Sequence, residues 1–157
     1  MFDQHEFDIN EYIDKLPVLE DSTFIEESAT TSKRSLSKLN ISLWNCRGLC
    51  TISKRRKKLT HILSKNYDIN ILTETKLQEE HIDYFKKFDE CKYDVFANTN
   101  GNMRGVLLMV KKSTPLKPQI LERSECGNSI IFTINHDNQD IIIAAVYGPN
   151  EDKPKFY

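Results

Sequence analysis

Three polar side chains stand at the ends of apolar runs in this chain of 157 residues. Asn45 ends an alternating run, Glu74 ends a continuous one, and Tyr147 ends a third. A carboxylate is a ligand for a hard cation such as Mg²⁺, and a tyrosine hydroxyl can donate a hydrogen bond to a phosphate oxygen. Two structural alternatives stay open: Glu74 could cap the turn that follows it, and Tyr147 could be a half-buried strand residue.

A run of five basic residues, Lys54–Lys58, follows the first of these positions. Such a run can bind nucleic-acid backbone phosphates, a contact that carries affinity but no base-sequence information. A solvated helix face and a nuclear-localisation patch are the alternatives. The four histidines are interpreted as ordinary surface residues, not as catalytic groups: His5, His61, His81 and His136.

The elements that would position Asn45 and Glu74 follow from hydrophobic periodicity. Residues 39–45 alternate as a strand does, Ser53 could cap a helix that runs to about Asn66, and residues 69–74 form a short apolar strand. Together they predict a βαβ unit with a right-handed crossover and parallel strands. Because the carboxyl ends of parallel strands meet at one edge of a sheet, Asn45 and Glu74 are predicted to share that edge.

The remainder of the chain predicts one further helix and then mainly strands. A helix is expected near residues 79–88, with Ile82, Phe85 and Phe88 facing inward. Runs of period two are expected to form strands at 93–97, 104–111, 119–123, 129–135 and 141–147. Short turns between them indicate antiparallel neighbours. The fold class is therefore α/β (α+β): a mixed sheet system with helices covering outer faces.

Composition and charge divide the chain into a tail and a body. Residues 1–38 hold nine acidic and four basic residues and are expected to be a disordered tail and linker. An amphipathic partner-docking helix is the alternative there. Residues 39–157 hold 14 acidic and 18 basic residues, which is compatible with a polyanionic partner.

Two classes of protein are disfavoured by the sequence. No stretch of about 18 apolar residues is present, so no membrane-spanning helix is predicted. Four scattered cysteines without a CxxC pair favour a reduced, intracellular compartment over a disulfide scaffold. They are Cys46, Cys50, Cys91 and Cys126.

Four motifs in order resemble those of the endonuclease/exonuclease/phosphatase superfamily. They are WNCRGL at 44–49, LTETKL at 72–77, RGVLLMVKK at 104–112 and AVYGPN at 145–150. Within that superfamily the chain is most similar to the apurinic-type endonuclease domain of LINE-type (non-LTR) retrotransposons. The resemblance covers residues 39–157 and implies a two-sheet α/β sandwich of the DNase I-like type, of which this chain would hold the N-terminal part.

The resemblance also implies chemistry and site residues. It implies Mg²⁺-dependent hydrolysis of DNA phosphodiesters, with Mn²⁺ as an alternative cofactor. Glu74 matches the metal-binding glutamate, and Asn45 matches the asparagine that arranges the metal and the scissile phosphate. Tyr147 matches the tyrosine that contacts the phosphate, and Asn150 matches an asparagine of the same loop. Lys76 would lie near the metal site, where it could tune the Glu74 carboxylate or contact DNA.

The chain departs from the family pattern in two ways. Arg47 stands where some members carry an aspartate, so a phosphate contact is expected there in place of a metal ligand. The second departure is that the family's Asp-x-Asn pair, later aspartate and terminal histidine group have no match, which predicts a truncated, inactive domain.

The basic residues Arg55, Arg56 and Lys57 would contact the DNA backbone.

Alternative functions stay open at this point. One is another phosphoesterase of the same superfamily, a lipid or inositol phosphatase. Another is a non-enzymatic remnant or binding module. For the complete parent element, DNA is the expected partner, no membrane is involved, and a nuclear location is expected.

Overall fold

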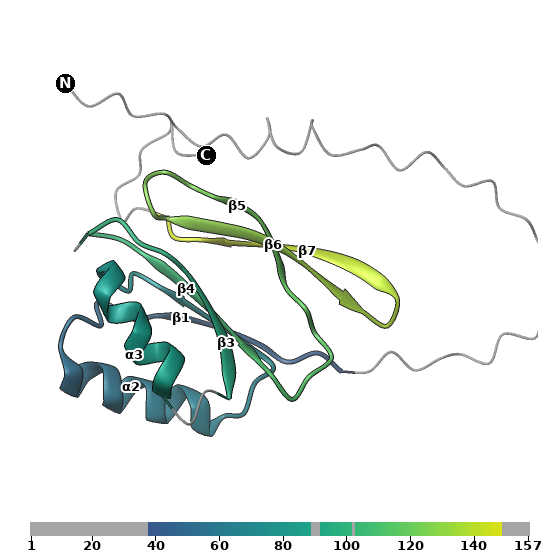
Figure 1. Cartoon of the computed structure of the whole chain (residues 1–157), viewed down its shortest axis with the longest axis horizontal. Helices are drawn as coiled ribbons and strands as arrows, with labels where there is room; N and C mark the ends of the chain where they lie inside the picture. The colour runs from purple at the N-terminus through teal and green to yellow at the C-terminus, as the bar shows by residue number, and fades with distance from the viewer. Residues whose placement is uncertain (1–37, 89–91, 102, 149–157) are drawn as a thin grey trace, which may run out of the picture. The chain divides into compact units, whose positions relative to one another are not determined.

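Two β-sheets and a layer of helices make up the described part of the protein, shown in a computed structural model (Figure 1). The structure describes residues 38–88, 92–101 and 103–148. Residues 1–37 of the predicted tail and the candidate Asn150 lie outside these residues. The described residues belong to one compact unit, Ser37–Gly148.

The first sheet has the order β1-β2-β4-β3 and contains the predicted βαβ unit. Its strands are β1 (Ile41–Asn45), β2 (Ile69–Thr73), β3 (Tyr93–Asn98) and β4 (Val106–Lys111). β1 and β2 are parallel, with Asn45 beside Thr73, and the β2–β4 and β3–β4 pairs are antiparallel. All five residues of β2 are buried, because β2 has a strand on both sides and is covered on both faces.

Helices cover one face of this sheet (Figure 1). They are α2 (Ile52–Ser64), the 3₁₀ helix η1 (Glu79–His81) and α3 (Ile82–Lys87). Leu59 and Ile62 of α2 and Phe85 of α3 pack in one core with Leu72 and other sheet residues. The helix boundaries differ from the prediction: α2 begins after Thr51, whose carbonyl accepts the Arg55 N–H at 3.0 Å, and not at Ser53.

The second sheet is antiparallel in the order β5-β6-β7 and packs against the other face of the first. Its strands are β5 (Gln119–Arg123), β6 (Ser129–His136) and β7 (Gln139–Val146). The core between the sheets holds Ile71 and Leu108 from the first sheet and Ile130, Phe132 and Ala145 from the second. The predicted antiparallel neighbours are confirmed for β3–β4, β5–β6 and β6–β7. The prediction is wrong for β4 and β5, which lie in different sheets and do not pair.

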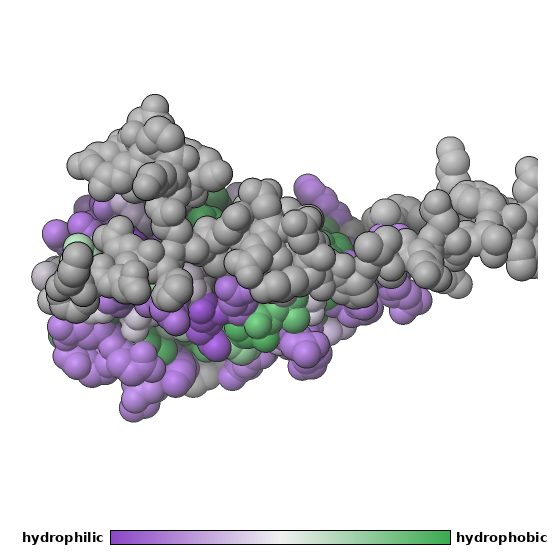
Figure 2. All heavy atoms as spheres, turned by 90° about the horizontal axis from the view of Figure 1, so that it is seen from above, coloured by the Kyte–Doolittle hydropathy of each residue, from purple (hydrophilic) through white to green (hydrophobic). Residues whose placement is uncertain are grey.

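The outer face of the second sheet exposes apolar side chains. Leu121, Ile142 and Val146 are 39%, 47% and 38% exposed. Hydrophobic surface is visible between hydrophilic surface in Figure 2, which views the molecule from above. Within the described ranges no helix covers this sheet, so the prediction of helices on outer faces holds for the first sheet alone. None of the described helices is long and apolar enough to cross a membrane.

Candidate functional site

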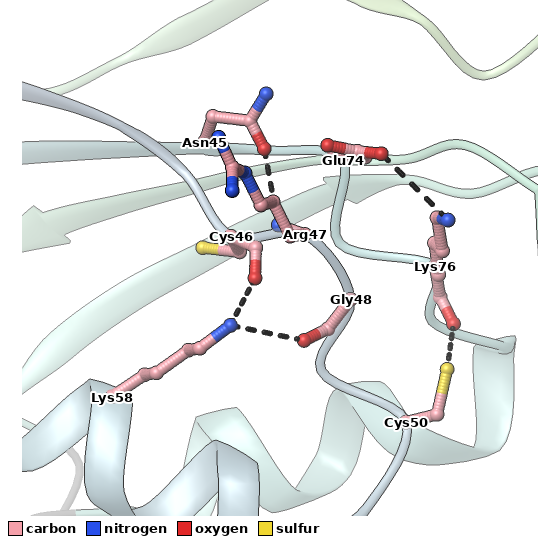
Figure 3. Close-up of polar contacts among 8 residues, drawn as sticks. All are labelled: Asn45, Cys46, Arg47, Gly48, Cys50, Lys58, Glu74 and Lys76. Atoms are coloured by element: carbon pink, nitrogen blue, oxygen red, sulfur yellow. Dashed lines mark hydrogen bonds and ion pairs between the residues drawn. The ribbon is translucent and has the colours of Figure 1, made fainter.

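Asn45 and the residue after β2, Glu74, lie at the same edge of the first sheet, as the parallel pairing requires. Figure 3 shows the Asn45 amide and the Glu74 carboxylate on the same side of the loop that follows β1. Asn45 is exposed, and the Glu74 side chain retains 14% exposure. We call this edge, formed by residues 45–50, 74–76 and 104–105, the rim.

Backbone hydrogen bonds join the three segments of the rim. The N–H groups of Gly48 and Leu49 donate to the carbonyls of Glu74 and Thr75 at 2.8 and 2.7 Å. The N–H groups of Thr75 and Lys76 donate in turn to the carbonyls of Gly105 and Arg104, at 3.1 and 2.9 Å. These bonds extend the sheet beyond its strands, so the rim has a defined backbone.

Three charged residues of the rim adopt a left-handed backbone conformation. The φ angles of Arg47, Glu74 and Lys76 are 45°, 52° and 53°. The other described non-glycine residues with positive φ are asparagines or an aspartate, which tolerate that region better. Left-handed geometry at Glu and Lys costs free energy and persists only where the surroundings impose it. The backbone hydrogen bonds of the rim impose it here.

Two interactions fix the polar side chains of the rim. The Asn45 Oδ1 atom accepts the backbone N–H of Arg47 at 3.0 Å, which closes a local turn and orients the amide. The Lys76 ammonium lies 3.7 Å from the Glu74 Oε1 atom. Arg47 itself is exposed. The predicted positions of Asn45, Arg47, Glu74 and Lys76 therefore come together at one edge, while their roles stay predictions.

The basic run of α2 divides between two environments. Arg56 and Lys57 are exposed, as the predicted DNA contacts require. Arg55 differs from that expectation. It is only 5% exposed, donates to the Cys50 carbonyl at 2.8 Å and lies over the Tyr84 ring at 5.1 Å. Its guanidinium is committed to the fold, so we leave it out of the proposed DNA contacts.

Lys58 belongs to the basic run, but sequence reasoning missed its structural contact: its ammonium donates to the carbonyls of Cys46 and Gly48. Figure 3 shows it on the opposite side of the loop from Asn45 and Glu74. A signal is present in the sequence. Lys58 stands four residues before Ile62, so helical spacing places it on the stripe that faces the sheet.

Burial raises the pKa of the Cys46 thiol to about 11. The nearby Lys58 ammonium lowers this pKa, and the Glu74 carboxylate raises it. Cys46 is 3% exposed, whereas Cys50 is exposed and its Sγ atom donates to the Lys76 carbonyl at 2.9 Å. The two thiols of the rim should therefore differ in reactivity.

We expect iodoacetamide at pH 8 to modify Cys50 much faster than Cys46. With a pKa near 11 in place of the usual 9.0, Cys46 holds about 100-fold less thiolate at that pH. Site-resolved mass spectrometry over time measures both rates in one sample. Equal rates in the native protein would contradict the burial of Cys46, and urea-unfolded protein serves as the control in which the two rates converge.

Tyr147 follows β7 and is half-buried against the core between the sheets. Its N–H donates to the Asn128 carbonyl at 2.8 Å. The Asn98 side chain, at the end of β3, donates to the carbonyls of Ser124 and Ser129 at 2.8 and 2.9 Å. A partly buried polar network thus joins the end of the first sheet to the turn that supports Tyr147.

The described histidines have structural contacts away from the rim. His61 meets the Trp44 ring edge-on at a centroid distance of 5.6 Å. The His81 Nδ1 atom accepts the Gln78 N–H at 3.2 Å in a capping box. His136 lies at the end of β6, 3.7 Å from the Asp137 carboxylate.

The donor set of the rim fits Mg²⁺ in part. No group of three or more His, Cys, Asp or Glu that could hold a metal occurs within the described residues. The rim offers one carboxylate, from Glu74, and one amide oxygen, from Asn45, whose second lone pair is not used by the Arg47 N–H. Mg²⁺ usually keeps several waters and binds through one or two carboxylates plus substrate phosphates, so this set is compatible with it.

No family model and no curated protein matches this chain. Among solved structures, the AP endonuclease LMAP of Leishmania major has a TM-score of 0.56 at 19% identity, covering 69% of this chain and 40% of that one. The Xenopus laevis APE2 catalytic domain has a TM-score of 0.54 at 21% identity, covering 73% and 46%. A D. rerio TDP2 humanized by 14 mutations has a TM-score of 0.50 at 23% identity, covering 68% and 48%.

The likeness to these structures shows the fold, a two-sheet α/β sandwich of the DNase I-like type. This confirms the fold class expected from the sequence. The chain spans less than half the length of each solved structure named above.

Proposed function

We propose that this chain carries the metal- and phosphate-binding part of a Mg²⁺-dependent DNA endonuclease domain of LINE-type retrotransposon origin. One observation carries the proposal: two parallel strands deliver the Asn45 amide and the Glu74 carboxylate to one rim, whose backbone conformation is held by hydrogen bonds between its segments. The same-fold structures include an AP endonuclease and an APE2 catalytic domain, which supports a nuclease. A nuclear location of the parent element is part of this proposal.

The side chains of the rim and two candidates that follow β7, Tyr147 and Asn150, divide the chemistry. Glu74 and Asn45 would hold the cation, which when bound polarises the phosphoryl oxygen and neutralises developing charge. Tyr147 would donate a hydrogen bond to the phosphate, and Arg47 and Lys76 would contribute positive charge. Lys76 also holds the Glu74 carboxylate in place through their 3.7 Å ion pair. Asn150 stays a candidate from the resemblance alone.

An experiment with the 157-residue chain tests this function. An oligonucleotide duplex containing an abasic-site analogue should shift the NMR signals of the rim amides, and the shifts should require Mg²⁺. Inositol phosphate at the same concentration is the competing ligand. Rim shifts with inositol phosphate and none with DNA would favour the lipid- or inositol-phosphatase alternative. Mg²⁺-independent shifts, or none, would contradict the proposal and favour the non-enzymatic alternative.

Catalysis is assayed separately on supercoiled plasmid. We expect the 157-residue chain to nick it only at background, because no residue of its sequence matches the family's acid–base group. Mg²⁺-dependent nicking that Glu74→Gln abolishes would overturn the expected inactivity while supporting the site.

Neutralising Arg56 and Lys57 together should weaken DNA binding and reduce its salt dependence. Both are exposed, and removing each phosphate-binding charge should lower the slope of log K against log salt by about 1. Fluorescence anisotropy of Arg56→Gln/Lys57→Gln across a salt series measures this. Lys117→Gln, an exposed lysine between β4 and β5, is the control. An unchanged slope would exclude both residues as DNA contacts.

A further inference from the structure

The basic run of α2 sends two side chains inward to the loop that carries Asn45. Arg55 and Lys58 are three residues apart, so they lie on one face of the helix. Arg55 donates to the Cys50 carbonyl, and Lys58 donates to the carbonyls of Cys46 and Gly48. Three alternate carbonyls of one short loop are therefore satisfied by two cations of one helix.

The loop needs the Arg55 and Lys58 side chains as donors because its N–H groups point across the rim, whereas its carbonyls point toward α2. The N–H groups of Cys46 and Gly48 donate to the carbonyls of Thr73 and Glu74, across the rim. Their own carbonyls face α2, and both residues are buried. A buried carbonyl without a donor is costly, so the half-buried Lys58 ammonium stabilises this loop path.

The position of Lys58 also bears on the site. Its two acceptors flank Arg47, the residue with φ of 45° whose N–H holds the Asn45 amide. Gly48, one of the two, donates to the Glu74 carbonyl. Lys58 thus contacts the backbone on both sides of Arg47. It is also linked indirectly to Glu74, because Gly48, which it contacts, bonds to the Glu74 carbonyl. Figure 3 shows the contacts of Lys58 with Cys46 and Gly48 and the contact between Asn45 and Arg47.

We propose that Lys58 is a positioning residue: it anchors the Cys46–Gly48 carbonyls so that Asn45 and Glu74 keep the relative placement that a divalent cation needs. The expected effect on cation binding rests on the proposed function, whereas the anchoring of the loop by Lys58 does not. Groups that orient metal ligands from behind commonly change metal affinity 10- to 100-fold when they are removed. Lys58 acts from the opposite side of the loop and is not a ligand or a DNA contact.

The test uses Lys58→Met in the full chain, with Mn²⁺ as the probe. We expect Mn²⁺ affinity to fall by about 10-fold or more, and hydrogen exchange of the Gly48 and Leu49 amides to accelerate. Lys58→Arg, which keeps a cationic donor, should restore most of both. Lys65→Met, an exposed lysine that follows the same helix, should change neither.

The two readouts separate this inference from the proposed function. Wild-type affinity in Lys58→Met, with the fold intact, would overturn the positioning role. If the wild-type chain binds no Mn²⁺ at the rim, the proposed function fails. Hydrogen exchange of the Gly48 and Leu49 amides then tests by itself whether Lys58 anchors the loop. Unchanged exchange at Gly48 and Leu49 would then overturn the anchor too. A general acceleration across the core, equal in Lys58→Met and Lys58→Arg, would mean that Lys58 serves stability only and would also overturn the inference.

Discussion

Replacing Glu74 with Gln should lower the affinity of the chain for Mn²⁺ by at least about 100-fold, because outer-shell changes alone cost up to that factor. The substitution keeps the size of the side chain and removes its charge. The described residues hold no cluster of three or more metal-binding side chains, so binding depends strongly on this one carboxylate. Electron paramagnetic resonance of free Mn²⁺ during titration measures the affinity directly.

A matched variant separates this effect from net charge. Glu122→Gln removes one carboxylate from β5, on the second sheet, and should bind Mn²⁺ as the wild type does. Equal affinity of the wild type and Glu74→Gln, with Glu122→Gln unchanged, would remove Glu74 from the metal site. A weaker affinity in both variants would indicate diffuse electrostatic attraction in place of a defined site.

Replacing Gly105 with Ala should lower the free energy of unfolding by about 3 kcal/mol, from steric overpacking together with backbone strain. A Cβ atom at Gly105 would lie 2.4 Å from the Thr75 Oγ1 atom, and the φ angle there is 134°. Thr75 is fully buried and branched at Cβ, so it cannot move aside at low cost. Urea denaturation followed by the fluorescence of Trp44, the single tryptophan, measures the change in stability.

Two controls make the Gly105 result specific. Gly101→Ala also has a positive φ, of 53°, but its Cβ would meet no atom within 4 Å, so it should cost about 1 kcal/mol. Thr75→Ala removes the clashing oxygen, which has no hydrogen-bond partner among the described residues. Thr75→Ala/Gly105→Ala should therefore recover part of the stability. No recovery would show that the clash with the Thr75 hydroxyl is not the cause of the lost stability.

The frame of the fold was predictable because hydrophobic periodicity reports burial. The alternation before Asn45 and the continuous apolar run before Glu74 located β1 and β2 within two residues, and the helix between them required a parallel pair. Its start was misplaced because Thr51 and Ser53 are both acceptable caps, and Thr51, the residue at the cap position, makes no side-chain cap bond. Local preference alone could not choose between them.

The detail of the rim was not predictable from the sequence. Nothing in the types of Arg47, Glu74 and Lys76 marks a left-handed backbone, because the conformation comes from hydrogen bonds between segments far apart in the chain. The different environments of the basic residues depend on which face of α2 packs on the sheet. That orientation buries Arg55 and exposes Arg56. Charge alone indicated five equivalent bases, and only the packing of α2 on the sheet distinguishes them.

The most direct test of the shared rim is paramagnetic broadening of amide signals by substoichiometric Mn²⁺ in the ¹⁵N-labelled chain. The account predicts that signals of Asn45, Arg47, Glu74 and Thr75 broaden first. The β6–β7 turn at Asp137 and Asn138 should stay sharp, since it lies at the far end of its strands from Tyr147. Broadening centred on that turn or spread evenly over acidic residues, with the rim signals sharp, would contradict a metal site formed by Asn45 and Glu74.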